Sequence, residues 1–142
     1  MISVVIDASV MTKWYIQENL SDYAEKIREG YINGRITLLA PTLLPYEVLN
    51  ALMYSNLFSN QELNIIGESL ENYGISLIAI TDNIRSTMVE IAKNHKISIY
   101  DASYIALAVE NKIQFITADS KIRKKLPAKL KERIINLEEY HL

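Results

Sequence analysis

Short apolar runs alternate along this chain with segments of helical periodicity, and this alternation restricts the fold more than any other feature. The runs lie at residues 2–6, 37–40, 76–80, 114–117 and 134–137. Nearly continuous apolar runs of this length are typical of strands that are buried on both faces of a parallel sheet. Strands that alternate with helices indicate βα units. We therefore predict an α/β fold with a central parallel sheet of four to five strands.

Local signals predict where several helices begin. Ser59 and Glu62 form a capping-box pattern, which predicts a helix from there to about Asn72. Pro45 suits the first turn of a helix that runs to about Asn56, because the missing N–H costs nothing there. Ser98 to Asp101 resembles a second capping box and opens a helix over 101–111. Further helices are expected over 9–17, over 21–33, after Thr81 or Asp82, and in the basic segment 121–133.

Length and composition exclude several classes of protein. A chain of 142 residues with 49% hydrophobic residues is expected to form one domain, residues 1–142, with a sizeable core. The absence of cysteine excludes disulfides, thiolate metal sites and a cysteine nucleophile. The two histidines, His95 and His141, argue against a zinc site. The start of the sequence predicts no signal peptide and no membrane span, so we expect a cytoplasmic protein.

Four acidic residues are expected at one edge of the predicted sheet. Asp7 and Asp119 each follow an apolar run, and ligand crevices of open α/β sheets form at the carboxyl ends of the strands. Glu47 and Asp101 lie in early turns of predicted helices that can face the same edge. Each acid has an ordinary alternative role: a helix cap for Asp7, a salt bridge for Glu47, completion of the capping box for Asp101, and a turn for Asp119.

Taken together, these acids predict a metal site. Carboxylates that lie close together repel one another, and a divalent cation removes that conflict. Oxygen ligands without cysteine or histidine favour Mg²⁺ or Mn²⁺. Such a site can activate a water and stabilise the charge that develops on a phosphodiester. Ser9 and Thr117 place hydroxyls beside Asp7 and Asp119, where they could hold water at the metal; a helix cap or a strand position is the alternative for each.

The C-terminal part of the chain is basic. Residues 1–120 hold 8 Lys or Arg and 14 Asp or Glu, whereas residues 121–142 hold 7 and 3. A basic segment after an acidic body is compatible with an enzyme that acts on a phosphate polymer, and equally with ordinary solubility. The candidates for contact with RNA phosphates are Lys121, Arg123, Lys124 and Lys125. A solvated helix face is the alternative.

Four segments resemble the PIN-domain ribonucleases, and especially the VapC-type toxins of prokaryotic toxin–antitoxin pairs. These segments are VVIDASV (4–10), LLPYEVLNAL (43–52), YDASYIALA (100–108) and FITADSKI (115–122). The resemblance covers nearly the whole length, with the motifs in the same order. It implies a three-layer α/β/α PIN-like fold with a central parallel sheet.

The resemblance also implies an activity and partners. It implies an acidic pocket of Asp7, Glu47, Asp101 and Asp119 that binds Mg²⁺ or Mn²⁺ and cleaves RNA as an endoribonuclease. We expect Asp7 and Asp119 to bind the metal directly, and Asp101 and Glu47 to complete the site directly or through water. It further implies a homodimer that a VapB-like antitoxin protein holds inactive.

Other functions stay open on the sequence alone. One is a non-catalytic PIN-like module that binds metal and RNA, or only a partner protein. Another is an RNA-processing PIN nuclease without an antitoxin. A phosphatase or phospho-receiver has a similar acidic edge, but a receiver uses a lysine after a late strand, and Lys121 is a poor substitute for it. With four glycines the chain has neither a P-loop nor a GxGxxG motif.

Overall fold

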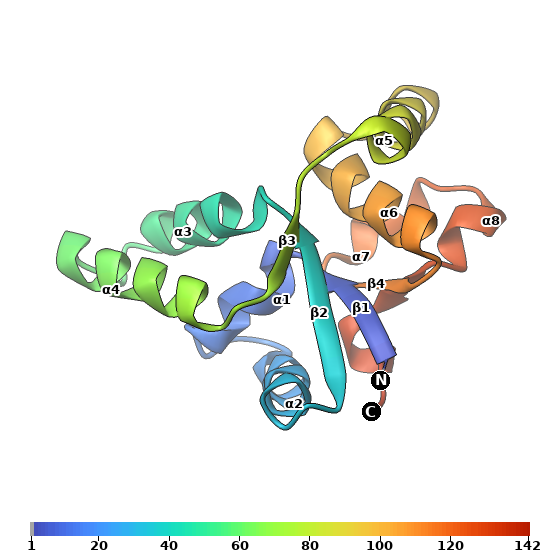
Figure 1. Cartoon of the computed structure of the whole chain (residues 1–142). Helices are drawn as coiled ribbons and strands as arrows, with labels where there is room; N and C mark the ends of the chain where they lie inside the picture. The colour runs from blue at the N-terminus through green and yellow to red at the C-terminus, as the bar shows by residue number, and fades with distance from the viewer. Residues whose placement is uncertain (1) are drawn as a thin grey trace.

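The centre of the molecule is a sheet of five parallel strands, in a computed structural model that describes residues 2–142. The spatial order of the strands is β3-β2-β1-β4-β5 (Figure 1). Their bounds are β1 Ile2–Ile6, β2 Ile36–Pro41, β3 Ser76–Ile78, β4 Gln114–Thr117 and β5 Ile134–Asn136. This arrangement confirms the predicted α/β fold with a central parallel sheet.

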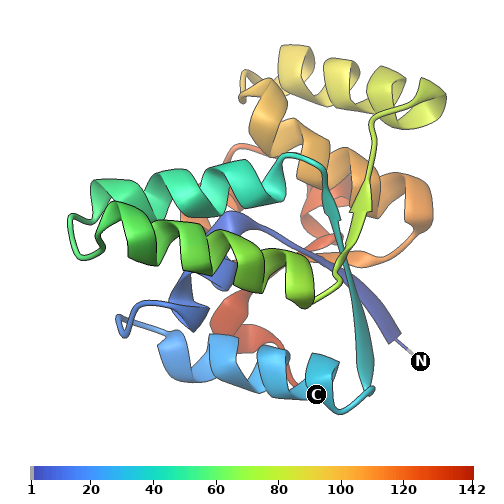
Figure 2. The ribbon, with the colours of Figure 1, turned by 60° about the vertical axis from the view of Figure 1, so that its left-hand side comes forward.

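Helices cover both faces of the sheet and complete a three-layer α/β/α arrangement. The α-helices are α1 Ala8–Met11, α2 Ser21–Ile32, α3 Leu44–Tyr54, α4 Asn60–Asn72, α5 Asp82–His95, α6 Ile99–Asn111, α7 Ser120–Lys124 and α8 Ala128–Lys131. Helices α1 to α4 lie on one side of the sheet, and α6 packs on the other side with α5 outside it (Figure 1). Figure 2 shows α3 and α4 side by side as a pair that projects from the sheet.

The core is built on the two central strands and on α6. Val5 and Ile6 of β1 and Phe115 and Ile116 of β4 are fully buried, and burial of each such side chain contributes about 1.5–3 kcal/mol. Helix α6 is buried on almost every side from Ala102 to Ala108, because it lies between the sheet and α5. The apolar run of this helix therefore reflects its two-sided burial.

The strand order reverses at β1. The chain runs from β1 outward to β2 and β3, and then returns to β4 on the other side of β1. The carboxyl ends of β1 and β4, which pair in parallel with Val5 opposite Phe115, thus form a topological switch point. Ligands of open α/β sheets bind in the crevice at such a point. Asp7 and Asp119 follow these two strands.

Several boundaries confirm the sequence prediction and others correct it. The capping box of Ser59 and Glu62 is present, and Pro45 lies in the first turn of α3. The strand predicted over 76–80 is only three residues long, because β3 is an edge strand that pairs with β2 alone. The helix predicted over 9–17 is also too long: α1 ends at Met11 and continues only as a 3₁₀ turn, Thr12–Trp14.

The basic segment 121–133 does not form one helix. It contains the short helices α7 and α8, with Pro127 as the N-cap of α8. Proline has no N–H and restricts the residue before it, so a helix cannot continue through this position without a break. Among residues 2–142, no helix has the length and apolar character that a membrane crossing requires.

Candidate active site

Asp7 is buried at the carboxyl end of β1, where both of its carboxylate oxygens accept hydrogen bonds. The residue is 7% exposed and serves as the N-cap of α1. Oδ1 accepts from the Ser9 hydroxyl and, at 3.3 Å, from the Val10 N–H. Oδ2 accepts from the Thr117 hydroxyl at 2.6 Å. These donors fix the orientation of the carboxylate, and one of them comes from the neighbouring strand.

The hydroxyls of Ser9 and Thr117 join the ends of β1 and β4. Besides donating to Asp7, Ser9 Oγ accepts from the Ala118 N–H at 2.9 Å, and Thr117 Oγ1 accepts from the Asp119 N–H at 3.0 Å. Asp119 then caps α7, since its Oδ1 accepts from the Lys121 N–H at 2.9 Å. The two polar positions chosen from the sequence therefore contact Asp7 directly and position the loop that carries Asp119.

Glu47 projects from the first turn of α3 and is held by a residue that the sequence did not single out. The Tyr104 hydroxyl donates to Glu47 Oε1 at 2.7 Å. Tyr104 is 2% exposed, and its ring stacks on Phe115 with 5.7 Å between centroids. Tyr104 lies three residues after Asp101 in α6, so both side chains share one face of that helix. This spacing was the available sequence signal for Tyr104.

The electrostatics of the acids show that they influence one another. Burial raises the pKa of Asp7 to about 6, despite its hydrogen bonds, and the charge of Glu47 adds to the rise. Burial likewise raises the pKa of Glu47, with a contribution from Asp101. Burial and the charge of Asp119 raise the pKa of Asp101. Glu47, Asp101 and Asp119 thus each disfavour ionisation of another acid of the group.

The oxygen atoms of these side chains are of the type that binds a hard divalent cation. The side chains would have to move closer together to coordinate one. Carboxylate and hydroxyl oxygens are the ligands that Mg²⁺ and Mn²⁺ prefer, and a cation would relieve the repulsion that raises these pKa values. Among residues 2–142, no three acidic or histidine side chains converge tightly enough to form a ready coordination set. Metal binding by Asp7, Glu47, Asp101 and Asp119 therefore stays a prediction.

The basic residues after Asp119 differ in their surroundings. Lys125 lies close enough to Asp101 for its charge to lower the pKa of that carboxyl, opposing the rise that burial causes. Lys121 and Lys124 are exposed. Arg123 instead donates from Nε to the Ile134 carbonyl at 3.2 Å, which ties α7 to β5. Three of the four predicted phosphate contacts are thus exposed, one of them beside Asp101, and the fourth makes a contact within the fold.

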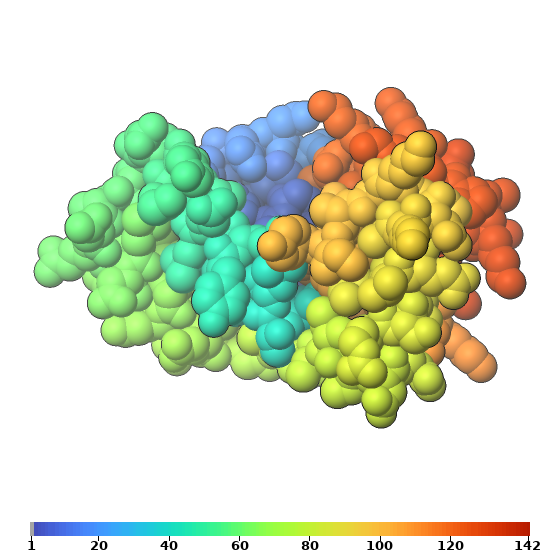
Figure 3. Space-filling view, turned by 90° about the horizontal axis from the view of Figure 1, so that it is seen from above, coloured from blue at the N-terminus to red at the C-terminus, as the bar shows by residue number. Residues whose placement is uncertain are grey.

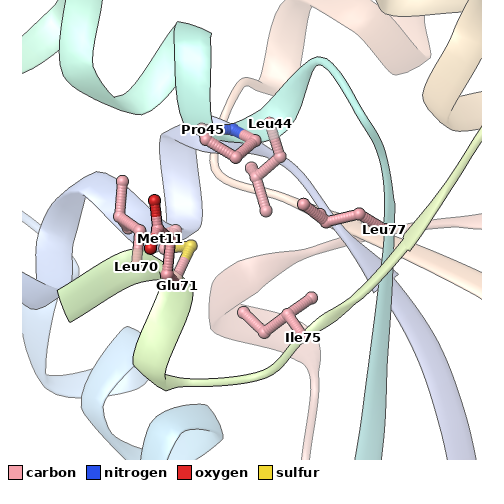
Figure 4. Close-up of a pocket in the computed structure, with 7 residues that line it drawn as sticks. All are labelled: Met11, Leu44, Pro45, Leu70, Glu71, Ile75 and Leu77. Atoms are coloured by element: carbon pink, nitrogen blue, oxygen red, sulfur yellow. The ribbon is translucent and has the colours of Figure 1, made fainter. Parts of the chain in front are cut away.

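Several hollows lie along α3, and one of them is lined by a candidate acid. Figure 3 looks down on the carboxyl edge, where the dark blue N-terminal residues form the floor of a hollow between the green and teal residues and the orange and red ones. A hollow that Ser9 and Glu47 line lies on the side of α3, between that helix and the N-terminal residues 8–18. Another is a cavity of about 60 Å³ beneath β3, between the start of α3 and the end of α4 (Figure 4). Its lining is apolar apart from Glu71, so it suits packing rather than phosphate chemistry.

Comparison with known proteins identifies the family of the chain. Residues 4–125 match the model of the PIN domain family. The chain belongs to the PIN-domain family. Among curated PIN proteins it is similar to "Ribonuclease VapC3" of Pyrobaculum aerophilum, with 26% identity over 129 residues, which cover 88% of this chain and 95% of the relative. The family resemblance drawn from the four sequence segments is therefore confirmed.

Solved structures confirm the PIN fold over nearly the whole chain. A toxin–antitoxin complex from Klebsiella pneumoniae aligns with a TM-score of 0.66 and 14% identity, and covers 98% of this chain and 99% of the other. VapC20 of Mycobacterium tuberculosis, described as a toxin that cleaves the sarcin–ricin loop, aligns with a TM-score of 0.64 and 10% identity over 91% of this chain and 93% of its own. At these identities the likeness concerns the fold.

Proposed function

We propose that this PIN-domain protein is a Mg²⁺- or Mn²⁺-dependent endoribonuclease, the toxin of a VapBC-like toxin–antitoxin pair. The observation that carries the proposal is the group of acids at the switch point of the sheet. Asp7, Glu47 and Asp101 have raised pKa values there. A bound cation would favour the ionised form of these carboxylates, and the ionised carboxylates would hold the cation. The ribonuclease name of the curated VapC3 relative supports the same activity.

Each residue of the site would have its own role in binding the cation or the RNA. Asp7, Glu47, Asp101 and Asp119 would hold the cation, with Ser9 and Thr117 fixing Asp7 and Tyr104 fixing Glu47. When bound, the cation supplies positive charge at the scissile phosphate and lowers the pKa of an attacking water. Lys125, beside Asp101, would hold a neighbouring phosphate of the RNA.

Two protein partners belong to the proposal. Similar structures include toxin–antitoxin complexes, such as VapBC2 from Rickettsia felis, which aligns with a TM-score of 0.66 and 11% identity. We therefore propose a VapB-like antitoxin and a homodimer, and an action in the cytoplasm, where both RNA and antitoxin would be met. Exposed apolar side chains on α3, on α4 and in the turn between them would supply contact area. They are Tyr46, Met53, Tyr54, Leu57 and Ile65.

Cleavage assays test the activity. A panel of single-stranded and structured RNAs is incubated with Mg²⁺, Mn²⁺ or EDTA, using the natural protein, Asp7→Asn and Asp101→Asn. We expect cuts that need the metal and that fall by at least about 100-fold in both variants, because each removes a charge from the cation site. Asp22→Asn, a change of an exposed acid in the first turn of α2, is the matched control and should cleave normally.

Full activity of Asp7→Asn or Asp101→Asn would contradict this assignment of the acids. A thermal melt with Mn²⁺ gives a second reading that needs no substrate, because a ligand that binds only the folded state raises its stability. We expect Mn²⁺ to raise the melting temperature of the natural protein and not that of Asp7→Asn.

A non-catalytic module is the second candidate, and one observation favours it. Both oxygens of Asp7 are already engaged by hydrogen bonds within the protein, and no three acidic or histidine side chains of residues 2–142 form a ready coordination set. Metal-independent RNA binding without cleavage would support that candidate.

An RNA-processing nuclease without an antitoxin would show cleavage, but the gene next to its own would encode no protein that inhibits it.

A further inference from the structure

A hollow runs from Glu47, one of the four acids, along the groove between α1 and α3. Its volume is about 470 Å³, within the range of pockets that hold small organic ligands, about 300–1,000 Å³. Ser9 and Glu47 lie among its lining residues, and so do Lys13 and Glu18 of the turn that follows α1. The same lining thus includes candidate active-site residues and residues that the activity proposed above does not use.

Three apolar side chains in the lining of this hollow offer contact area to the face of a flat ring. Ala8 and Ile16 line it from the N-terminal segment, and Ala51 lines it from α3. Alanine at two of these positions leaves space that a longer side chain would fill. Unpaired RNA bases are recognised by contacts to the ring face, commonly from aromatic or arginine side chains, and by hydrogen bonds at the ring edge. Here Ala8, Ile16 and Ala51 would supply the contacts to the ring face.

An ion pair in the lining supplies polar groups for such an edge. Lys13 Nζ lies 3.0 Å from Glu18 Oε1, and the Lys13 side chain is 12% exposed, compared with 43% for Glu18. An ammonium group has three N–H donors, of which Glu18 uses one, and a carboxylate has acceptor sites beyond the one that Lys13 occupies. The pair therefore presents free donors and free acceptors next to each other.

We propose that this hollow is a binding site for one unpaired guanine of the RNA substrate, beside the phosphate that is cleaved. The proposal rests on the ribonuclease function proposed above and adds a base preference to it. The edge of guanine carries an acceptor, O6, next to two donors, N1–H and N2–H. Lys13 would donate to O6, and the Glu18 carboxylate would accept from both nitrogens in a charge-assisted pair of bonds.

The other three bases match this ion pair less well. Adenine offers one donor next to a ring acceptor, so a carboxylate gains one hydrogen bond instead of two. Uracil carries its single N–H between two carbonyl oxygens, which a carboxylate repels. Cytosine carries one donor beside two acceptors. Guanine alone gives the carboxylate two neighbouring donors.

Binding of single nucleotides tests the site without cleavage. The nucleoside 5′- and 3′-monophosphates of all four bases are titrated into ¹⁵N-labelled protein with Mg²⁺, and the amide shifts of Ser9, Lys13 and Ala51 are followed. We expect the guanine nucleotides to bind at least about tenfold more tightly than the others, because only they satisfy both partners of the ion pair. Lys13→Met, Glu18→Gln and the space-filling Ala51→Trp should each abolish that preference.

The control is Lys93→Met, which removes an exposed lysine of α5 and should bind guanine nucleotides normally. A second experiment maps the cuts in a random RNA pool. We expect guanine at one fixed position relative to the cut for the natural protein and for Lys93→Met, but not for Lys13→Met.

The outcomes separate this proposal from the proposed function. Guanine nucleotide binding that Ala51→Trp abolishes would establish the site even if no RNA were cleaved. Metal-dependent cleavage with no base preference, together with equal shifts for all nucleotides or none, would overturn the guanine site and leave the nuclease intact. Tighter binding of another base would also overturn it.

Discussion

The hydroxyl of Tyr104 donates a 2.7 Å hydrogen bond to Oε1 of Glu47, so a tyrosine of the buried helix α6 positions an acid of α3. Tyr104→Phe removes this bond and keeps the stacking on Phe115. We expect cleavage to fall about tenfold with a stability change of at most about 1.5 kcal/mol, the net value of one hydrogen bond.

A pH profile shows whether Tyr104 acts through Glu47. The bond from Tyr104 lowers the pKa of Glu47, against the larger rise that burial causes, so the acidic limb of the profile should move to higher pH in Tyr104→Phe. Tyr100→Phe, at a position 60% exposed on the same helix, is the control and should leave rate and profile unchanged. An unshifted profile in Tyr104→Phe would contradict a positioning role.

Thr117→Val tests the contact between β1 and β4. Valine has nearly the shape of threonine but cannot donate to Asp7 or accept from the Asp119 N–H. We expect unfolding to become easier by about 1–3 kcal/mol, because a buried carboxylate loses a donor, and cleavage to fall at least about tenfold. Chemical denaturation measures the first and RNA cleavage the second. Thr87→Val, which loses only an exposed contact with Glu110, should change neither.

The raised pKa of Asp7 predicts how stability depends on pH. Asp7 loses its proton near pH 6 when folded but near its ordinary value of 3.8 when unfolded, so the unfolded state binds fewer protons between these values. The contribution of Asp7 to the free energy of unfolding is therefore fully present below about pH 4. Up to about 3 kcal/mol of this contribution is lost as the pH rises to 6 and above.

Asp7→Asn should remove that loss. The difference in unfolding free energy between Asp7→Asn and the natural protein, measured in urea at several pH values, should shift in favour of the variant as the pH rises from 4 to 7. Added Mn²⁺ should offset the loss at pH 7 in the natural protein only. A difference that does not change with pH would show that Asp7 keeps an ordinary pKa in the folded protein.

The basic residues after Asp119 should separate into two groups. Lys124→Gln and Lys125→Gln should each weaken RNA binding and reduce the slope of log affinity against log salt by about 0.7–1. Arg123→Gln should instead lower stability by about 1 kcal/mol, because it loses the contact with the Ile134 carbonyl. Salt titrations of RNA binding and thermal melts distinguish these results. An unchanged salt slope in both lysine variants would show that Lys124 and Lys125 do not contact RNA phosphates.

Local sequence patterns were sufficient to predict most of the strands and helices. The apolar runs identified all five strands, and Ser59 and Pro45 located the starts of α4 and α3, because capping and proline effects act within one helical turn. The predicted length of β3 was wrong. The length of an edge strand depends on how it pairs with its neighbour, and not on the length of its apolar run alone.

The sequence was sufficient to predict where the candidate acids lie in the fold, but not which side chains contact them. Asp7 and Asp119 follow strands, so the parallel topology alone brings them to one edge. The bond from Tyr104 to Glu47 joins residues 57 positions apart and depends on how α6 packs against α3, which no local pattern encodes. Arg123 appeared equivalent to its lysine neighbours until the position of β5 was known.

The bond between Asp7 and Thr117 joins the first strand of the chain to the fourth, 110 residues later. While the protein is being made, the ribosome therefore releases β1 and its acid long before the partner strand emerges. The arrangement that orients Asp7 cannot exist on that unfinished chain. On the ribonuclease function proposed above, we expect the unfinished chain to be inactive toward its own messenger during most of its synthesis, without help from any inhibitor.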